Sequence, residues 1–99
     1  MNSYNRTFTI PADGNKISEL DVKNRQIRIT VDFNPFFPPK SGKVKVVIKN
    51  EYQCTFSHRG DRSHILRLGK HASTELGLKA GTSVKFTVLR NNKYQLVTV

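Results

Sequence analysis

Residues 57–64, Ser57-His-Arg-Gly-Asp-Arg-Ser-His, carry the side chains of this chain with the greatest capacity for chemistry. They join two runs of strand-like alternation, residues 52–56 and 65–68. Arginine, aspartate, histidine and serine offer hydrogen-bond donors and acceptors of several geometries, and Gly60 allows the backbone to bend. Such a segment can bind a patterned polar surface, for example the base edges in the major groove of DNA. The simpler alternative is a solvated connection between two strands.

The cations of this loop are arginines, and this distinguishes it from a simple phosphate-binding segment. The planar guanidinium of Arg59 or Arg62 can hold guanine O6 and N7 together, which the point charge of a lysine does less selectively. Asp61 between them can orient an arginine or accept a hydrogen bond from a cytosine amino group. A loop that bound only phosphate would gain nothing from a carboxylate, so the pattern favours base reading. The predicted base-contacting residues of the loop are Ser57, His58, Arg59, Asp61, Arg62, Ser63 and His64.

All three histidines, His58, His64 and His71, lie in or near this loop, which raises two other kinds of site. Their spacing is not that of a zinc site in a helix or finger, and neither cysteines nor an acidic cluster add ligands. We therefore expect no metal and no other cofactor. Paired imidazoles beside cations could act as general acid and base in a metal-independent ribonuclease. That enzyme requires both rings to converge on one phosphate.

The net charge of the chain indicates a polyanionic partner. Seventeen Lys and Arg against seven Asp and Glu give a formal charge of +10 at pH 7 and a pI near 10.2. Such a surplus repels itself unless a polyanion is near, and nucleic acid is the usual one. The sequence has no long apolar run, amphipathic basic helix or lipidation signal, so we expect no membrane partner.

Residues 25–49 carry six basic side chains and one acidic one, and three of their lysines are spaced for one face of a strand. Such a row could follow a phosphate backbone, or it could be a solvated face that discourages pairing of sheet edges. Phosphate contacts supply affinity and register without sequence preference. The predicted phosphate-contacting residues are Arg28, Lys43, Lys45, Lys49, Arg67 and Lys70.

The single cysteine, the first residues and the aromatic residues indicate the cellular compartment of the protein and the form of nucleic acid that it binds. Cys54 is the single cysteine, which excludes an intramolecular disulfide, and its place in an alternating run predicts a buried thiol. The first residues lack the apolar segment of a secretory signal, so we expect a cytoplasmic protein. Most aromatic side chains fall on inward strand faces, whereas binders of single strands expose aromatic rows. Duplex DNA is therefore the favoured partner.

Period-two alternation of apolar residues dominates the chain and predicts about seven short strands. Their number and small size favour a mainly β fold, a small seven-stranded open β-barrel with one or two short helices, in a single domain over residues 1–99. A sheet that closes on itself removes exposed edges. The expected strands are residues 7–10, 25–33, 43–49, 52–56, 65–68, 84–88 and 94–99.

Between the strands, one helix and two irregular segments are expected. Leu68, Ala72 and Leu76 recur at spacing four before Gly77, which predicts a helix with a left-handed glycine at its end. Residues 16–20 could form a helical turn, although the adjacent Asp-Gly pair favours a loop. The three prolines of residues 34–39 exclude a strand. The two phenylalanines of that segment, Phe36 and Phe37, are expected to plug one end of the core.

The order of these elements and the motifs at their boundaries resemble the B-three-type DNA-binding pseudobarrel over residues 20–99. The matching pieces are Gly42-Lys-Val-Lys-Val-Val-Ile-Lys, the polar loop, His64-Ile-Leu-Arg-Leu, the helix at residues 69–76, and Gly77-Leu-Lys-Ala-Gly-Thr-Ser-Val-Lys-Phe-Thr-Val. Swapped-hairpin transition-state regulators carry a turn similar to the last piece. Plant members of the family usually have Gly-Trp before the helix, and this chain has no tryptophan. The effector domains of bacterial restriction enzymes of the EcoRII kind are the more similar branch.

This resemblance implies two arms that grip the major groove on either side of a strand platform. The C-terminal arm would be residues 57–64 and the N-terminal arm residues 19–25, in which Lys23, Asn24 and Arg25 face the DNA. The resemblance implies a monomeric recognition module with no catalysis of its own, fused to a nuclease domain or working with a separate one. The acidic residues lack the paired Asp/Glu-x-Lys pattern of a metal-dependent nuclease. The alternatives are a dimeric swapped-hairpin transcription regulator and the histidine-dependent ribonuclease.

Overall fold

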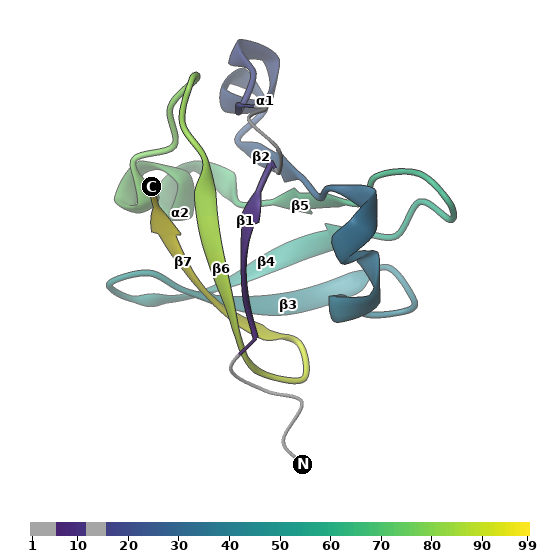
Figure 1. Ribbon diagram of the computed structural model, residues 1–99. Helices are drawn as coiled ribbons and strands as arrows, with labels where there is room; N and C mark the ends of the chain where they lie inside the picture. Colours follow the sequence, from purple (N-terminus) through teal and green to yellow (C-terminus); the bar gives the residue numbers. More distant parts are fainter. Residues whose placement is uncertain (1–5, 12–15) are drawn as a thin grey trace.

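The computed structural model describes residues 6–11 and 16–99, and over these residues the protein is mainly β. Seven strands form one sheet that curls into a nearly closed barrel (Figure 1). The seven-stranded barrel predicted from the sequence is confirmed. The strands are β1 (Thr7–Ile10), β2 (Gln26–Arg28), β3 (Gly42–Val47), β4 (Glu51–Ser57), β5 (Ile65–Arg67), β6 (Val84–Arg90) and β7 (Lys93–Thr98). The described residues also include three short helices rather than one or two, namely α1 (Glu19–Lys23), η1 (Val31–Phe36) and α2 (Gly69–Leu76).

The strand order is β1-β6-β7-β3-β4-β5-β2, so β1 and β2 are the two ends of the sheet. All neighbouring strands are antiparallel except β3 and β7, which run parallel. A parallel pair requires a long crossover, and here the chain from β4 to β6, including α2, provides it. All seven strands of the barrel come from one chain, and its open seam lies between β1 and β2.

The core of the barrel follows the predicted alternation. In β3, Val44 and Val46 are buried, while Lys43 and Lys45, which alternate with them, are exposed. In β6, Phe86 is fully buried, in line with the inward row expected there. Burial of each such side chain contributes on the order of 1.5–3 kcal/mol.

An aromatic cluster joins the N-terminal strand to the proline-rich segment. The ring of Phe8 stacks on Phe33 at 4.6 Å and on Phe36 at 5.1 Å. Phe37 is buried and stacks on Tyr94 at 4.8 Å between ring centroids. The Tyr94 hydroxyl donates a hydrogen bond of 2.8 Å to the carbonyl of Phe36. The prediction that the two adjacent phenylalanines plug the core is confirmed.

The predicted strand at residues 25–33 is too long. The amide of Ile29 still donates to the His64 carbonyl at 2.8 Å, but Val31 is already the first residue of η1 and is 47% exposed. The chain turns because the Phe33 amide bonds to the Thr30 carbonyl at 2.8 Å, in the i to i+3 pattern of a 3₁₀ helix. Pro35 tolerates this turn because its ring fixes φ in the helical range.

Two further expectations concern the helices α1 and α2. The helix predicted after residue 68 is confirmed as α2, and Gly77 ends it with φ of 72° while its amide bonds to the Ser73 carbonyl. The preference for a loop at residues 16–20 is wrong in part, because α1 begins at Glu19. Ser18 starts it, since its hydroxyl accepts a hydrogen bond of 3.1 Å from the Asp21 amide. Among the described residues, no helix is long and apolar enough to cross a membrane.

Candidate nucleic-acid interface

The C-terminal arm, residues 57–64, is a hydrogen-bonded loop between β4 and β5. The amide of His58 donates to the Ser41 hydroxyl at 2.8 Å, and the Asn34 side-chain amide donates to the Arg62 carbonyl at 3.3 Å. Within the loop, the Arg62 amide bonds to the Arg59 carbonyl at 3.1 Å. Gly60 has φ of 63°, a conformation that L side chains rarely adopt. These contacts give the arm a defined shape rather than that of a solvated linker.

Two histidines hold the arm from inside. His64 is 2% exposed, and its Nδ1 accepts a hydrogen bond of 2.9 Å from the Arg59 amide. Its ring lies edge-on to Phe56 and 4.2 Å from the ring of His58, whose Nδ1 accepts from the Gly60 amide at 3.2 Å. Burial lowers the pKa of His64, and the neighbouring His58 lowers it further. An Nδ1 that accepts a hydrogen bond requires the neutral imidazole.

His64 therefore differs from the other residues that were predicted to contact bases. Its side chain is buried and occupied by the backbone of its own loop, so we exclude it from the candidate contact surface. The same placement weighs against the ribonuclease, which needs both imidazoles at one phosphate. Asp61 and Arg62 are exposed, and the remaining predicted residues of the loop are half-buried, namely Ser57, His58, Arg59 and Ser63.

The N-terminal arm, residues 19–25, consists of α1 and the turn that follows it. Lys23, Asn24 and Arg25 are all exposed, as a contact surface requires. Arg25 has φ of 51°, and its amide bonds to the Val22 carbonyl at 3.1 Å. This turn directs the chain from the helix into β2 and leaves the three polar side chains at the corner.

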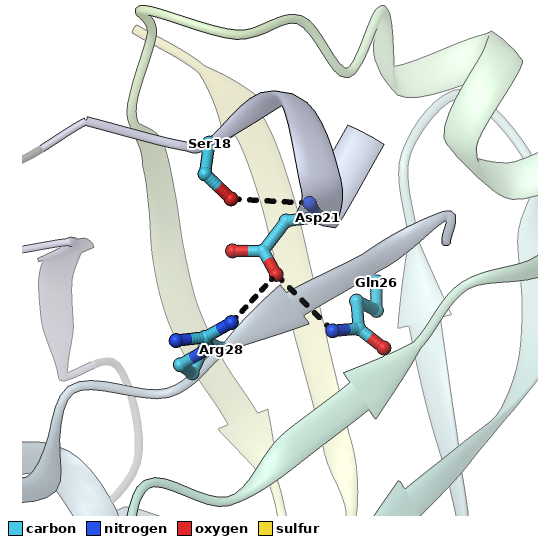
Figure 2. A network of polar contacts seen from close by, with 4 residues as sticks. All are labelled: Ser18, Asp21, Gln26 and Arg28. Carbon is cyan, nitrogen blue, oxygen red and sulfur yellow. Dashed lines mark hydrogen bonds and ion pairs between the residues drawn. The ribbon is translucent and has the colours of Figure 1, made fainter. Parts of the chain in front are cut away.

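A buried carboxylate ties α1 to β2 (Figure 2). Asp21 is 7% exposed, and its Oδ1 accepts from Gln26 Nε2 at 3.1 Å and from Arg28 Nη2 at 3.4 Å. The Arg28 side chain keeps half of its surface exposed, so the ion pair fixes it without removing it from solvent. Sequence reasoning missed Asp21. The available signal was the Ser-x-x-Asp pattern at Ser18, which is typical of a helix start.

The two arms lie at opposite ends of one short ladder, the pairing of β2 with β5. At one end the Leu68 amide bonds to the Arg25 carbonyl of the N-terminal arm, and at the other the Ile29 amide bonds to the His64 carbonyl of the C-terminal arm. The ladder pairs three residues of each strand, Gln26–Arg28 with Ile65–Arg67, and so spans roughly 10 Å. Figure 1 shows α1 at the top and the 58–64 loop at the right, with β2 and β5 between them.

The outward face of the sheet carries a transverse row of polar residues across four strands. Gln26 pairs with Arg67, Arg67 with Thr55, and Thr55 with Lys43. Arg67 and Lys43 are exposed, and Lys43 Nζ bonds to the Thr55 hydroxyl at 2.8 Å. Arg28 and Lys45 lie on the same face, because each stands two residues from a member of the row. Four of the six predicted phosphate-contacting residues thus share one face.

The other two predicted phosphate contacts lie elsewhere. Lys49 was predicted to continue the row, but β3 ends at Val47, and Lys49 sits in the turn before β4. The seven residues of β4 place that turn roughly 20 Å from the start of the C-terminal arm. Lys49 and Lys70 instead line a depression beside α2, together with Glu75. The Glu75 carboxylate holds the turn, because it accepts from the amides of Lys49 at 3.0 Å and Asn50 at 2.7 Å.

The cysteine and the possible metal ligands can also be placed. Cys54 is buried as predicted, and burial raises the pKa of its thiol to about 11. Within the part of the chain that the structure describes, no group of three His, Cys, Asp or Glu residues could hold a metal ion.

The fold is shared with solved structures from a plant and a bacterium. The structure of a hypothetical Arabidopsis thaliana protein, At1g16640.1, matches all of this chain and 94% of its own, with a TM-score of 0.74 and 14% identity. The N-terminal domain of Helicobacter pylori LlaJI.R1 matches 94% of this chain and 79% of its own, with a TM-score of 0.69 and 14% identity. No protein-family model and no curated protein matches the sequence. At this identity the likeness establishes the pseudobarrel fold and no more.

Proposed function

We propose that this domain binds duplex DNA with sequence preference, with both arms in the major groove and the transverse row on the phosphates. One observation carries the proposal: two polar arms stand at opposite ends of the β2–β5 ladder, and the sheet face beside it carries Arg28, Arg67 and Lys43. The roughly 10 Å length of the ladder is close to the major-groove width of about 12 Å. The spacing of the arms therefore suits one groove.

In this proposal the two arms contact the bases, and the sheet face contacts the phosphates. Arg62 and Asp61 in the C-terminal arm, with Arg59 beside them, present a guanidinium fork and an acceptor to base edges. In the N-terminal arm, Asn24 suits adenine and Arg25 suits guanine or phosphate. The cations of the sheet face hold the duplex without reading it.

We further propose that the domain is a non-catalytic, monomeric recognition module of a restriction system in the cytoplasm, with the nuclease in a fused or separate domain. The name of the Helicobacter neighbour, LlaJI.R1, is that of a restriction-system protein, which supports this setting. Two structural facts weigh against the alternatives. The barrel uses strands of one chain and needs no strand exchange, unlike a swapped-hairpin regulator, and the burial of His64 disfavours a histidine-based ribonuclease.

Selection of binding sites from random-sequence duplex DNA tests the proposal. We expect one enriched motif whose bound fraction falls with rising salt, because phosphate contacts contribute to every complex. Binding without an enriched motif would leave a sequence-independent phosphate binder. No binding to any duplex at low salt would overturn the proposed function.

A further inference from the structure

A groove lies where β3 meets the β6–β7 hairpin, outside the two arms. It has a volume of about 370 Å³. The parallel register pairs Lys45 with Lys93, and the Lys45 amide donates to the Asn92 carbonyl at 2.8 Å. The groove is lined by four cations from three strands, Lys43, Lys45, Arg90 and Lys93, with side-chain amides beside them. Such a concentration of positive charge is unfavourable unless anions offset it.

One carboxylate of the protein offsets part of this charge. Glu51 Oε1 lies 3.0 Å from Lys93 Nζ, and its Oε2 lies 3.5 Å from Lys45 Nζ. The hydrogen bond and charge of Lys93 hold the pKa of Glu51 below its usual value, so the carboxylate is ionised at neutral pH. The groove therefore keeps a surplus of positive charge, with Arg90 exposed at its edge. Glu51 is itself exposed to solvent, so an external anion can compete for its two lysines.

The groove is continuous with the proposed DNA-binding face. Lys43 lines the groove and is also the last member of the transverse row, in register with Thr55 and Arg67. Cations thus extend across the outward face from β2 to β7. The longest dimension of the molecule is 36 Å, which corresponds to about ten base pairs of B-DNA at 3.4 Å per step.

We propose that this groove is a second phosphate-binding surface for the duplex that flanks the recognised site, and that Glu51 is an internal counter-ion which DNA phosphate displaces. The inference rests on the proposed DNA binding and adds a contact outside the arms. A phosphate oxygen placed between Lys45 and Lys93 exchanges one ion pair for another, and the carboxylate moves into solvent. The contact adds affinity on every sequence and no discrimination.

Removal of the counter-ion gives the sharpest test, because it predicts a gain. Glu51→Gln should tighten binding to cognate and random duplexes alike by about two- to fivefold, the range that an exposed ion pair can contribute. Arg90→Ala should weaken both and lower the salt slope by about one unit. Thermal unfolding should change little in either variant, since exposed ion pairs add little stability. Binding is measured by fluorescence anisotropy over a range of salt concentrations.

Two double variants separate a local effect from a change in net charge. Both Glu51→Gln/Lys93→Gln and Glu51→Gln/Lys85→Gln restore the net charge of the wild type. Lys85 is an exposed lysine near the other end of β6, five residues from Arg90. We expect the gain to disappear in the first double variant and to persist in the second. Loss of the gain in both would assign it to net charge and overturn the proposal.

Duplex length gives an independent measurement. On a duplex trimmed to the recognised site, Glu51→Gln and Arg90→Ala should bind as the wild type does, and their effects should appear once about ten flanking base pairs are added. If the wild type binds with sequence preference but these variants match it on long duplexes, the groove proposal fails alone. If the wild type binds no duplex, the proposed function itself fails.

Discussion

The two arms flank the same β2–β5 ladder, but a buried imidazole holds one and a buried carboxylate holds the other. In the C-terminal arm, a buried imidazole accepts from the loop backbone, at the contact of His64 Nδ1 with the Arg59 amide. In the N-terminal arm, a buried carboxylate accepts from side chains of the next strand, at the contacts of Asp21 with Gln26 and Arg28. The His64 contact lies within the first arm, whereas the Asp21 contacts join the second arm to β2. Each arm can therefore be loosened while the other stays in place.

Substitution of His64 should have the largest effect. His64→Ala leaves a cavity against Phe56 and an Arg59 amide without its acceptor, so we expect the free energy of unfolding to fall by about 2–4 kcal/mol. Urea denaturation measures this loss. The folded fraction should lose its preference for the selected DNA site and keep salt-sensitive binding to random duplex. His58→Ala, at the half-buried partner ring, is the control and should cost less; an equal cost would show that His64 does not hold the arm.

Substitutions in the arms and on the sheet face compare the proposed base contacts with the proposed phosphate contacts. Arg62→Ala and Asn24→Ala should each cost about 1–3 kcal/mol on the selected site and much less on random DNA. Lys43→Gln, on the sheet face, should weaken all duplexes alike and lower the salt slope by about one unit. Anisotropy titrations with both DNAs measure the three variants. A uniform loss for Arg62→Ala would reduce the C-terminal arm to a phosphate clamp.

The core and most strands could be predicted because apolar and polar residues alternate along the strand segments of the sequence. The β6 row and the helix ended by Gly77 follow from local patterns alone. The end of β2 could not be predicted in this way. Val31 continues the alternation of apolar residues in the sequence, but in the structure it is the first residue of η1 and lies outside the sheet. That turn is held by contacts distant in sequence, such as the stack of Phe33 on Phe8.

The candidate site could be predicted only as two segments. Residue types pointed to polar arms, and the structure brings them to the two ends of one ladder. Composition could not show which polar residues face inward, so His64 was assigned to the surface and Asp21 was missed. The prediction that Lys49 continues the lysine row was wrong for a different reason. Its spacing from Lys45 is that of one strand face, but a strand end between them breaks the row.

Removal of the Asp21 carboxylate should loosen the N-terminal arm alone. Asp21→Ala leaves the buried Gln26 side-chain amide without its acceptor, and we expect a loss of about 1–2 kcal/mol of unfolding free energy. Discrimination should fall at the bases read by Asn24 and persist at those read by Arg62, as site selection with the variant would show. Glu19→Ala, in the same helix but exposed, is the matched control. Equal loss at both sets of bases would contradict independent arms.

Acid should loosen the C-terminal arm by a smaller amount than any of these substitutions. Because the pKa of His64 is lowered in the folded protein, the unfolded chain binds its proton first as the pH falls below the ordinary value of 6.5. The contribution of His64 to stability is therefore complete above pH 6.5 and is lost as the pH falls through its folded pKa. Glu75 and Glu51 do not interfere, because hydrogen bonds from the Asn50 amide and from Lys93 hold their pKa values below the ordinary value of a glutamate.

This window allows the final comparison of the arms. Unfolding free energy and DNA discrimination, measured between pH 7.5 and pH 5.5, should both fall for the wild type. In His64→Asn, whose side-chain oxygen can accept from the Arg59 amide but does not titrate, the fall should be smaller. Asp21→Ala, with the histidine intact, should keep the wild-type pH dependence. An equal pH dependence in wild type and His64→Asn would show that the neutral imidazole is not what fixes the C-terminal arm.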